Sequence, residues 1–134
     1  MIAVDTSVAL PLLLTNHERH DDVTAWAQGK ELALCGHALV ETYSVLTRLP
    51  GDNRFSPEDA VRVMDDLFYE PVLLKSEKLP LLHHELLSAG VSGGAVYDGI
   101  IGIAAKQNQV ALASFDRRAI NTYFAVGAVI ELVG

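Results

Sequence analysis

Residues 2–14 read IAVDTSVALPLLL, and this stretch determines the class of fold that the sequence predicts. A short apolar run over 2–4 ends in Asp5, and two hydroxyl residues and a second apolar run follow directly. This is the pattern of a buried strand that turns straight into a helix, which Thr6 or Ser7 is able to cap. An acid at the carboxyl end of such a strand lies where open parallel sheets bind their ligands.

The same alternation of strand and helix patterns continues along the chain. Strand patterns are predicted at 31–35, 71–74, 110–114 and 128–130, and helical patterns at 16–30, 38–49, 57–69, 78–89 and 96–105. Strands that alternate with helices favour a parallel sheet covered on both faces. We therefore predict one α/β domain over residues 1–134, with three α/β/α layers and a mainly parallel sheet of four to five strands.

The composition sets limits on the class of protein. No stretch approaches the roughly 20 apolar residues that cross a bilayer, and residues 1–5 do not resemble a signal peptide. The single cysteine, Cys35, excludes an intrachain disulfide and suits a reducing compartment, so we expect a cytoplasmic protein with no membrane contact. The net charge of −7 argues against simple nucleic-acid binding unless acids are neutralised by bound cations.

Four acids stand at positions that suggest a shared site. Asp5 and Asp116 each follow a predicted strand, and both enter one crevice if these strands are neighbours. Glu41 and Asp98 lie instead near the start of apolar helices, where a solitary buried carboxylate is costly. Clustered carboxylates with no evident basic partner suit a hard cation, with Mg²⁺ or Mn²⁺ the best fit. Phosphodiester hydrolysis is the reaction that such a cation supports best.

Each acid also has a purely structural interpretation. Asp5 can act only as a helix cap, Asp116 can be a solvated turn residue, and Glu41 and Asp98 can face water. The joint placement of the four acids favours the metal site over these alternatives. Two hydroxyl residues beside them, Thr6 and Ser114, are candidates to orient ligands or metal-bound water.

These residues also carry a family resemblance, because the chain resembles PIN-domain proteins and, more narrowly, VapC-type toxins of bacterial toxin–antitoxin pairs. The resemblance implies a metal-dependent endoribonuclease that uses Asp5, Glu41, Asp98 and Asp116 to cut structured RNA, such as transfer or ribosomal RNA. It also implies a homodimer that a VapB-type antitoxin silences. The matching segments are Ile2–Ser7, His17–Trp26, Ala38–Pro50, Val96–Ile101 and Ala113–Arg118.

The RNA contacts and two rival functions complete the predictions. Arg117 and Arg118 directly follow the last acid and are candidate contacts for RNA phosphates. An α/β phosphotransfer or phosphatase domain is one rival, but that type of phosphatase needs an acid where Ser7 stands. A PIN-like module that only binds partners is the other rival, and the presence of all four acids argues against it.

Overall fold

The centre of the protein is a four-stranded sheet in which every strand pair is parallel. The computed structural model describes residues 1–133. The strands follow the spatial order β2-β1-β3-β4, which makes β1 and β3 direct neighbours, with Val4 opposite Ala113. Their bounds are β1 Ile2–Val4, β2 Leu32–Leu34, β3 Ala111–Ala113 and β4 Ile130–Glu131.

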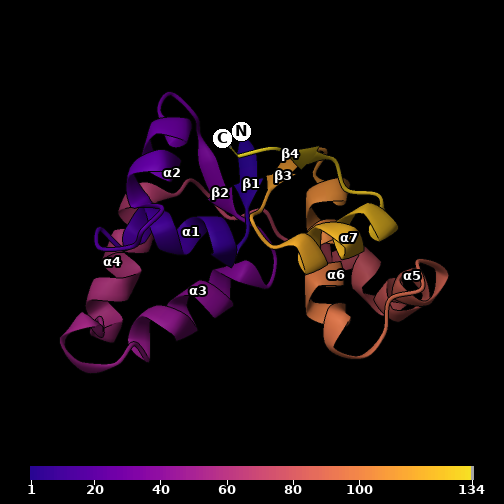
Figure 1. Cartoon of the computed structure of the whole chain (residues 1–134). Coiled ribbons are helices and arrows are strands. Elements are labelled where there is room, and N and C mark those ends of the chain that lie inside the picture. Colours follow the sequence, from indigo (N-terminus) through magenta and orange to yellow (C-terminus); the bar gives the residue numbers. More distant parts are fainter. Residues whose placement is uncertain (134) are drawn as a thin grey trace.

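The helices cover both faces of this sheet. Figure 1 shows α1 to α4 on one side of the strands and α5 to α7 on the other. The α-helices are α1 Thr6–Leu13, α2 His20–Ala27, α3 Ala38–Thr47, α4 Pro57–Leu67, α5 Leu82–Ser88, α6 Val96–Gln107 and α7 Arg117–Val126, and the 3₁₀ turns are η1 Gly51–Asn53, η2 Ser76–Leu81 and η3 Gly93–Ala95.

Two apolar clusters fill the spaces between the sheet and its helices. Ala3 and Leu112 belong to one cluster, whereas their chain neighbours Val4 and Ala113 belong to the other. This separation follows from the period of two along a strand, which sends successive side chains to opposite faces. The predicted three-layer α/β/α arrangement is confirmed, and Cys35 is a fully buried core residue. None of the helices within residues 1–133 is long and apolar enough to cross a membrane.

The predicted fifth strand is reduced to a single bridge. Over 71–74, Val72 alone is paired, in a parallel bridge with Cys35 just after β2: its N–H donates to Leu34 O at 2.9 Å, and its carbonyl accepts from Gly36 N at 2.7 Å. Pro71, just before it, has no N–H to extend the ladder. The last strand lies at Ile130–Glu131, slightly beyond the predicted 128–130.

Two predicted helices are shorter than the sequence pattern suggests. The pattern at 78–89 begins as the 3₁₀ turn η2, which contains Pro80, and becomes α-helical only at Leu82. Proline lacks the N–H that an α-helical turn needs, which accounts for this delay. The pattern at 16–30 yields α2 over His20–Ala27 only.

Helices α6 and α7 pack closely where Gly102 of α6 faces α7. A Cβ built on Gly102 would lie 2.6 Å from Val126 Cγ2 and 3.2 Å from the Cα of Tyr123. The absence of a side chain at Gly102 thus lets the backbone of α7 approach α6. This approach brings the fully buried Tyr123 ring toward the centre of the molecule.

Candidate active site

Asp5 joins the carboxyl end of β1 to the start of α1 and is 4% exposed. The cap of α1 is therefore Asp5 and neither Thr6 nor Ser7, which corrects the sequence prediction. Asp5 Oδ1 accepts from the backbone N–H of Ser7 at 3.1 Å and from its hydroxyl at 2.6 Å. Asp5 Oδ2 accepts from the Ser114 hydroxyl at 2.5 Å and from the Tyr123 hydroxyl at 2.7 Å. The structural role of Asp5 as a cap thus coexists with its place in a polar network.

The two serines extend this network to the segment that carries Asp116. Ser7 Oγ accepts from the backbone N–H of Phe115 at 2.8 Å, and Ser114 Oγ accepts from that of Asp116 at 3.0 Å. The two serine hydroxyl oxygens lie 3.2 Å apart. Because β1 and β3 are neighbours, the turns that follow them are tied together at the carboxyl edge of the sheet.

Burial raises the pKa of Asp5 above its ordinary value, because it disfavours the ionised form. The hydrogen bonds from Ser114, Ser7 and Tyr123 act in the opposite direction and favour the carboxylate. The network therefore offsets part of the cost of placing this charge in the interior.

The pKa of Asp98 is raised above its ordinary value, and the charges of the other three acids contribute to this rise. Burial is the largest cause of the raised pKa, and repulsion from Asp116, Asp5 and Glu41 follows in that order. The nearby His37 acts in the opposite direction. The charges of four acids, spread over more than a hundred positions of the chain, therefore act in one region.

Four helix N-termini supply these acids. Asp5 and Asp116 are the N-caps of α1 and α7, and Glu41 and Asp98 lie in the first turns of α3 and α6. The positive end of a helix dipole stabilises a nearby negative charge by about 0.3–1 kcal/mol. This contribution makes the accumulation of like charges tolerable, but it does not neutralise it.

The acids are gathered but not arranged as a ready ligand cage. Within residues 1–133 no three acid, histidine or cysteine side chains form a group that could hold a metal ion as they stand. Asp5 points its oxygens at hydroxyl groups, and Asp116 Oδ1 accepts from the N–H groups of Arg118 and Ala119 at 3.0 and 3.3 Å. Carboxylates that lack a neutralising partner turn to local hydrogen-bond donors, which explains this arrangement.

The donor chemistry of this region fits a hard divalent cation. All four acids offer oxygen ligands, which such cations prefer. The ion pairs in the described part of the chain are Arg62–Asp59 and Lys106–Glu85, and neither involves these acids. The repulsion felt at Asp98 is the kind of excess negative charge that a bound cation removes.

The predicted supporting residues fall in different places. Ser114 contacts Asp5 directly, whereas the buried Thr6 places its hydroxyl 3.2 Å from that of Thr42, beside Glu41. Arg117 and Arg118 are exposed in the first turn of α7.

Two partners of Asp5, Ser7 and Tyr123, were not predicted from the sequence. The position of Ser7 after the first strand indicates a helix cap, and the one signal for Tyr123 is that a buried tyrosine hydroxyl needs an acceptor.

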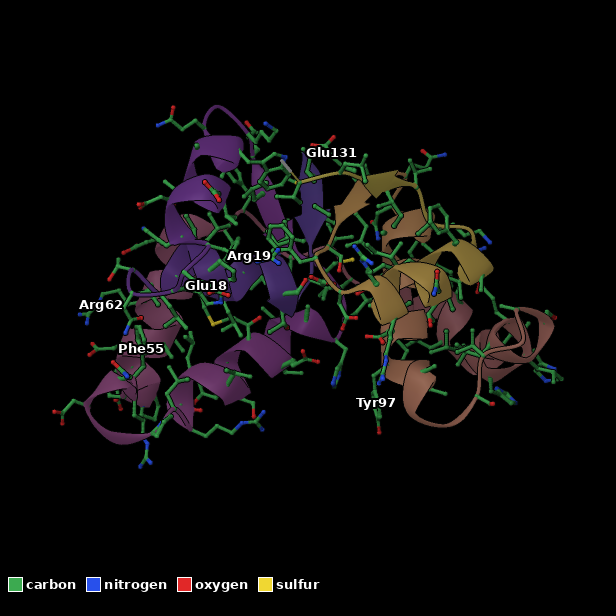
Figure 2. All side chains as sticks on the ribbon, viewed as in Figure 1. Glu18, Arg19, Phe55, Arg62, Tyr97 and Glu131 are labelled. Atoms are coloured by element: carbon green, nitrogen blue, oxygen red, sulfur yellow. The ribbon has the colours of Figure 1, made fainter. Side chains whose placement is uncertain are left out.

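Two aromatic contacts flank the region of the acids. The rings of His37 and Tyr97 lie 4.8 Å apart between their centroids, and Tyr97 is 56% exposed. Figure 2 shows Tyr97 pointing outward from the protein. On the segment that follows β3, the guanidinium carbon of Arg19 lies 4.5 Å from the centroid of the Phe115 ring.

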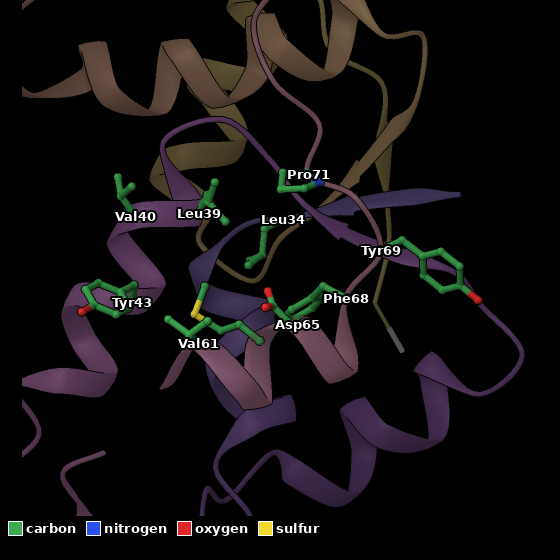
Figure 3. Close-up of a pocket in the computed structure, with 10 residues that line it drawn as sticks. Leu34, Leu39, Val40, Tyr43, Val61, Asp65, Phe68, Tyr69 and Pro71 are labelled. Atoms are coloured by element: carbon green, nitrogen blue, oxygen red, sulfur yellow. The ribbon is translucent and has the colours of Figure 1, made fainter. Parts of the chain in front are cut away.

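An apolar pocket between α3 and α4 is separate from the acids. Figure 3 shows its lining, which includes Leu39, Tyr43, Val61 and Phe68. None of the four candidate acids lines it, and its one carboxylate is Asp65. The pocket therefore offers apolar contact area but no set of groups for hydrolysis.

Comparison with known proteins assigns this arrangement to a family. The family model described as PIN domain matches residues 2–125. The chain belongs to the PIN-domain family. It is 49% identical over 126 residues to Ribonuclease VapC27 of Mycobacterium tuberculosis, covering 94% of this chain and 92% of the relative. It is also 38% identical to Ribonuclease VapC40 of the same species over 134 residues, covering 99% of each protein.

The fold agrees with this PIN-domain assignment. The structure of FitAB bound to the IR36 DNA fragment matches with a TM-score of 0.74 at 19% identity, over 98% of this chain and 94% of that one. At this identity the likeness shows the fold alone. PIN-domain ribonucleases generally depend on a divalent metal, which agrees with the oxygen-rich donor set around Asp98.

Proposed function

We propose that this PIN-domain protein is a magnesium-dependent endoribonuclease, the toxin of a toxin–antitoxin pair, and that it cuts structured RNA such as transfer or ribosomal RNA. The observation that carries the proposal is the convergence of Asp5, Glu41, Asp98 and Asp116 on one region at the carboxyl edge of the sheet. The ribonuclease names of VapC27 and VapC40 support the same activity.

In this proposal the four acids hold the cation and the surrounding residues hold the acids. Bound Mg²⁺, or Mn²⁺ in its place, supplies the positive charge that attracts a phosphodiester and the acidity that makes water a nucleophile. In the metal-free protein Ser114 donates its hydroxyl to Asp5 and so helps to orient it. Thr6 steadies α3 next to Glu41 through Thr42. A fixed arrangement of ligands lowers the cost of bringing RNA and water into line.

The exposed arginines provide the contacts that the acidic chain otherwise lacks. Arg117 and Arg118 directly follow Asp116 and are exposed, so a phosphate at the acids lies within the reach of long cationic side chains. We assign them to the RNA backbone, where they contribute affinity without sequence preference.

The partners and setting follow from the same assignment. We propose a homodimer, silenced by a VapB-type antitoxin in which an arginine pairs with the acids and displaces the cation. The excess of negative charge around Asp98 favours such a basic inhibitor. We further propose that residues 1–134 act as a single PIN-like domain and that the protein works in the cytoplasm, where its RNA substrates lie.

Cleavage of RNA by the purified, antitoxin-free protein tests the proposal. Wild-type protein should produce discrete cuts in total RNA with Mg²⁺ or Mn²⁺ and none with a chelator. Asp5→Asn and Asp98→Asn should lose these cuts, whereas Asp52→Asn, a change of an exposed acid in η1, should retain them. Equal cleavage by the wild type and both site variants would refute the site. Binding of RNA without any cut in the presence of metal would favour the rival interaction module.

A further inference from the structure

The carboxylate of Asp5 is saturated with hydrogen bonds. An ionised carboxylate offers about four lone-pair positions. Ser7 fills those of Oδ1 with its backbone N–H and its hydroxyl, and Ser114 and Tyr123 fill those of Oδ2. A cation that takes Asp5 as a ligand therefore needs one of these donors to withdraw. The structure indicates which donor can do so.

The two serine hydroxyls have somewhere else to go. Their oxygens lie 3.2 Å apart, so either hydroxyl can donate to the other after releasing Asp5. Each serine oxygen accepts one backbone N–H, from Phe115 or Asp116, and so retains a free acceptor position. A serine can thus turn away from Asp5 without leaving a buried hydrogen unpaired.

The Tyr123 hydroxyl has no such alternative. Its side chain is 0% exposed, and among the hydrogen bonds within residues 1–133 its one partner is Asp5 Oδ2, at 2.7 Å. Breaking this bond would leave a buried donor unpaired, which is costly. The close contact of α7 with Gly102 fixes the ring in place.

We propose that Tyr123 is a positioning residue for Asp5: its hydroxyl holds Oδ2 permanently, while the Ser7–Ser114 pair withdraws a hydrogen bond and so frees a lone pair of Asp5 for the incoming cation. The inference rests on the proposed metal-dependent function and adds a division of labour within the network. Groups that orient metal ligands typically change metal affinity by about 10- to 100-fold when removed.

Direct binding of Mn²⁺ to metal-free protein tests this division, by calorimetry or electron paramagnetic resonance. Tyr123→Phe keeps the ring and removes only the hydroxyl, and it should weaken Mn²⁺ binding about tenfold. Ser114→Ala should weaken it by about threefold or less, because the structure gives Ser114 an exchangeable role. Tyr43→Phe is the matched control, since Tyr43 lies at the surface of α3, and should bind as the wild type does. Unchanged binding by Tyr123→Phe, or a larger loss in Ser114→Ala, would overturn the proposal.

Cleavage kinetics separate positioning from general structural damage. Excess Mn²⁺ should restore kcat in Tyr123→Phe while KM for RNA stays unchanged throughout, and a defect that metal does not rescue contradicts the proposal. If the wild type binds Mn²⁺ but cuts no RNA, the proposed function fails and the Mn²⁺ comparison still decides the role of Tyr123. If the wild type binds no Mn²⁺, both fail.

A measurement on the wild type covers the case in which Tyr123→Phe does not fold. Exchange of the Tyr123 hydroxyl proton can be followed through the isotope shift of its ¹³Cζ resonance in mixed H₂O and D₂O. We expect slow exchange both without and with Mg²⁺, because the hydrogen bond to Asp5 persists. Fast exchange in the metal-free protein, or faster exchange once Mg²⁺ binds, would show that Tyr123 does not hold Asp5.

Discussion

Replacing Asp98 by asparagine should stabilise the metal-free protein and remove its response to metal. Asp98 is half-buried and is repelled by the charges of Asp116, Asp5 and Glu41. Each such pair costs on the order of 0.5–1 kcal/mol at separations beyond direct contact, so the substitution should relieve roughly 2 kcal/mol. The substitution also removes the attraction between the Asp98 carboxylate and the N-terminus of α6, and this loss offsets about 0.3–1 kcal/mol of the stabilisation. The net stabilisation should be about 1–1.5 kcal/mol.

Thermal unfolding in chelator and in excess Mg²⁺ measures both parts of this prediction. For a chain of this size the net gain corresponds to a rise in Tm of roughly 3–7 °C in chelator. A cation at 100 times its Kd adds about 2.7 kcal/mol, or roughly 10 °C, to the wild type, and Asp98→Asn should lose most of that increase. Asp52→Asn should match the wild type in both conditions. A Tm in chelator no higher than that of the wild type, or a full response to Mg²⁺, would refute the reasoning.

Three further changes test the network and its packing. Ser7→Ala removes a donor to Asp5 and leaves the N–H of Phe115 unpaired, so urea unfolding should show a loss of about 1–3 kcal/mol. Gly102→Ala forces a Cβ to within 2.6 Å of a side chain of α7 and should cost about 1–3 kcal/mol in the same assay, whereas Gly94→Ala, which meets nothing within 4 Å, should cost less than about 1 kcal/mol. The raised pKa of Asp5 and that of Asp98 mean that the folded protein holds protons that the unfolded chain releases, so their contribution to stability is full below the ordinary pKa of 3.8 and is lost as pH rises above it. Chemical unfolding in chelator between pH 4 and 7 should show this loss, and Asp98→Asn should flatten it.

The parts of the fold that local sequence controls could be predicted. The strand that ends in Asp5 and the order of the strands follow from apolar patterns that each occupy a few neighbouring residues, as do all of the α-helices except α7, which was not predicted. The run at 71–74 has the same apolar pattern as a strand, but Pro71 and its position beside the outer strand β2 leave only the pairing of Val72. Local pattern does not reveal how many ladder bonds a segment can make.

The candidate site shows the same division between local and distant information. The four acids were identifiable because each occupies a recognisable place at a strand end or a helix start. Tyr123 was not identifiable, because it lies 118 positions from Asp5 and on a helix, α7, that the sequence analysis did not predict. Only the close packing of α6 and α7, which Gly102 permits, turns its hydroxyl toward the site.

The pairing of Asp5 with Ser114 and Tyr123, 109 and 118 positions away, means that the first strand acquires its polar partners late in synthesis. While a ribosome is still adding the segment after β3, the emerging polypeptide has neither the fourth acid nor the phenol that holds the first. The hydrogen-bond network around Asp5 therefore forms only after α7 has been made and has packed against α6.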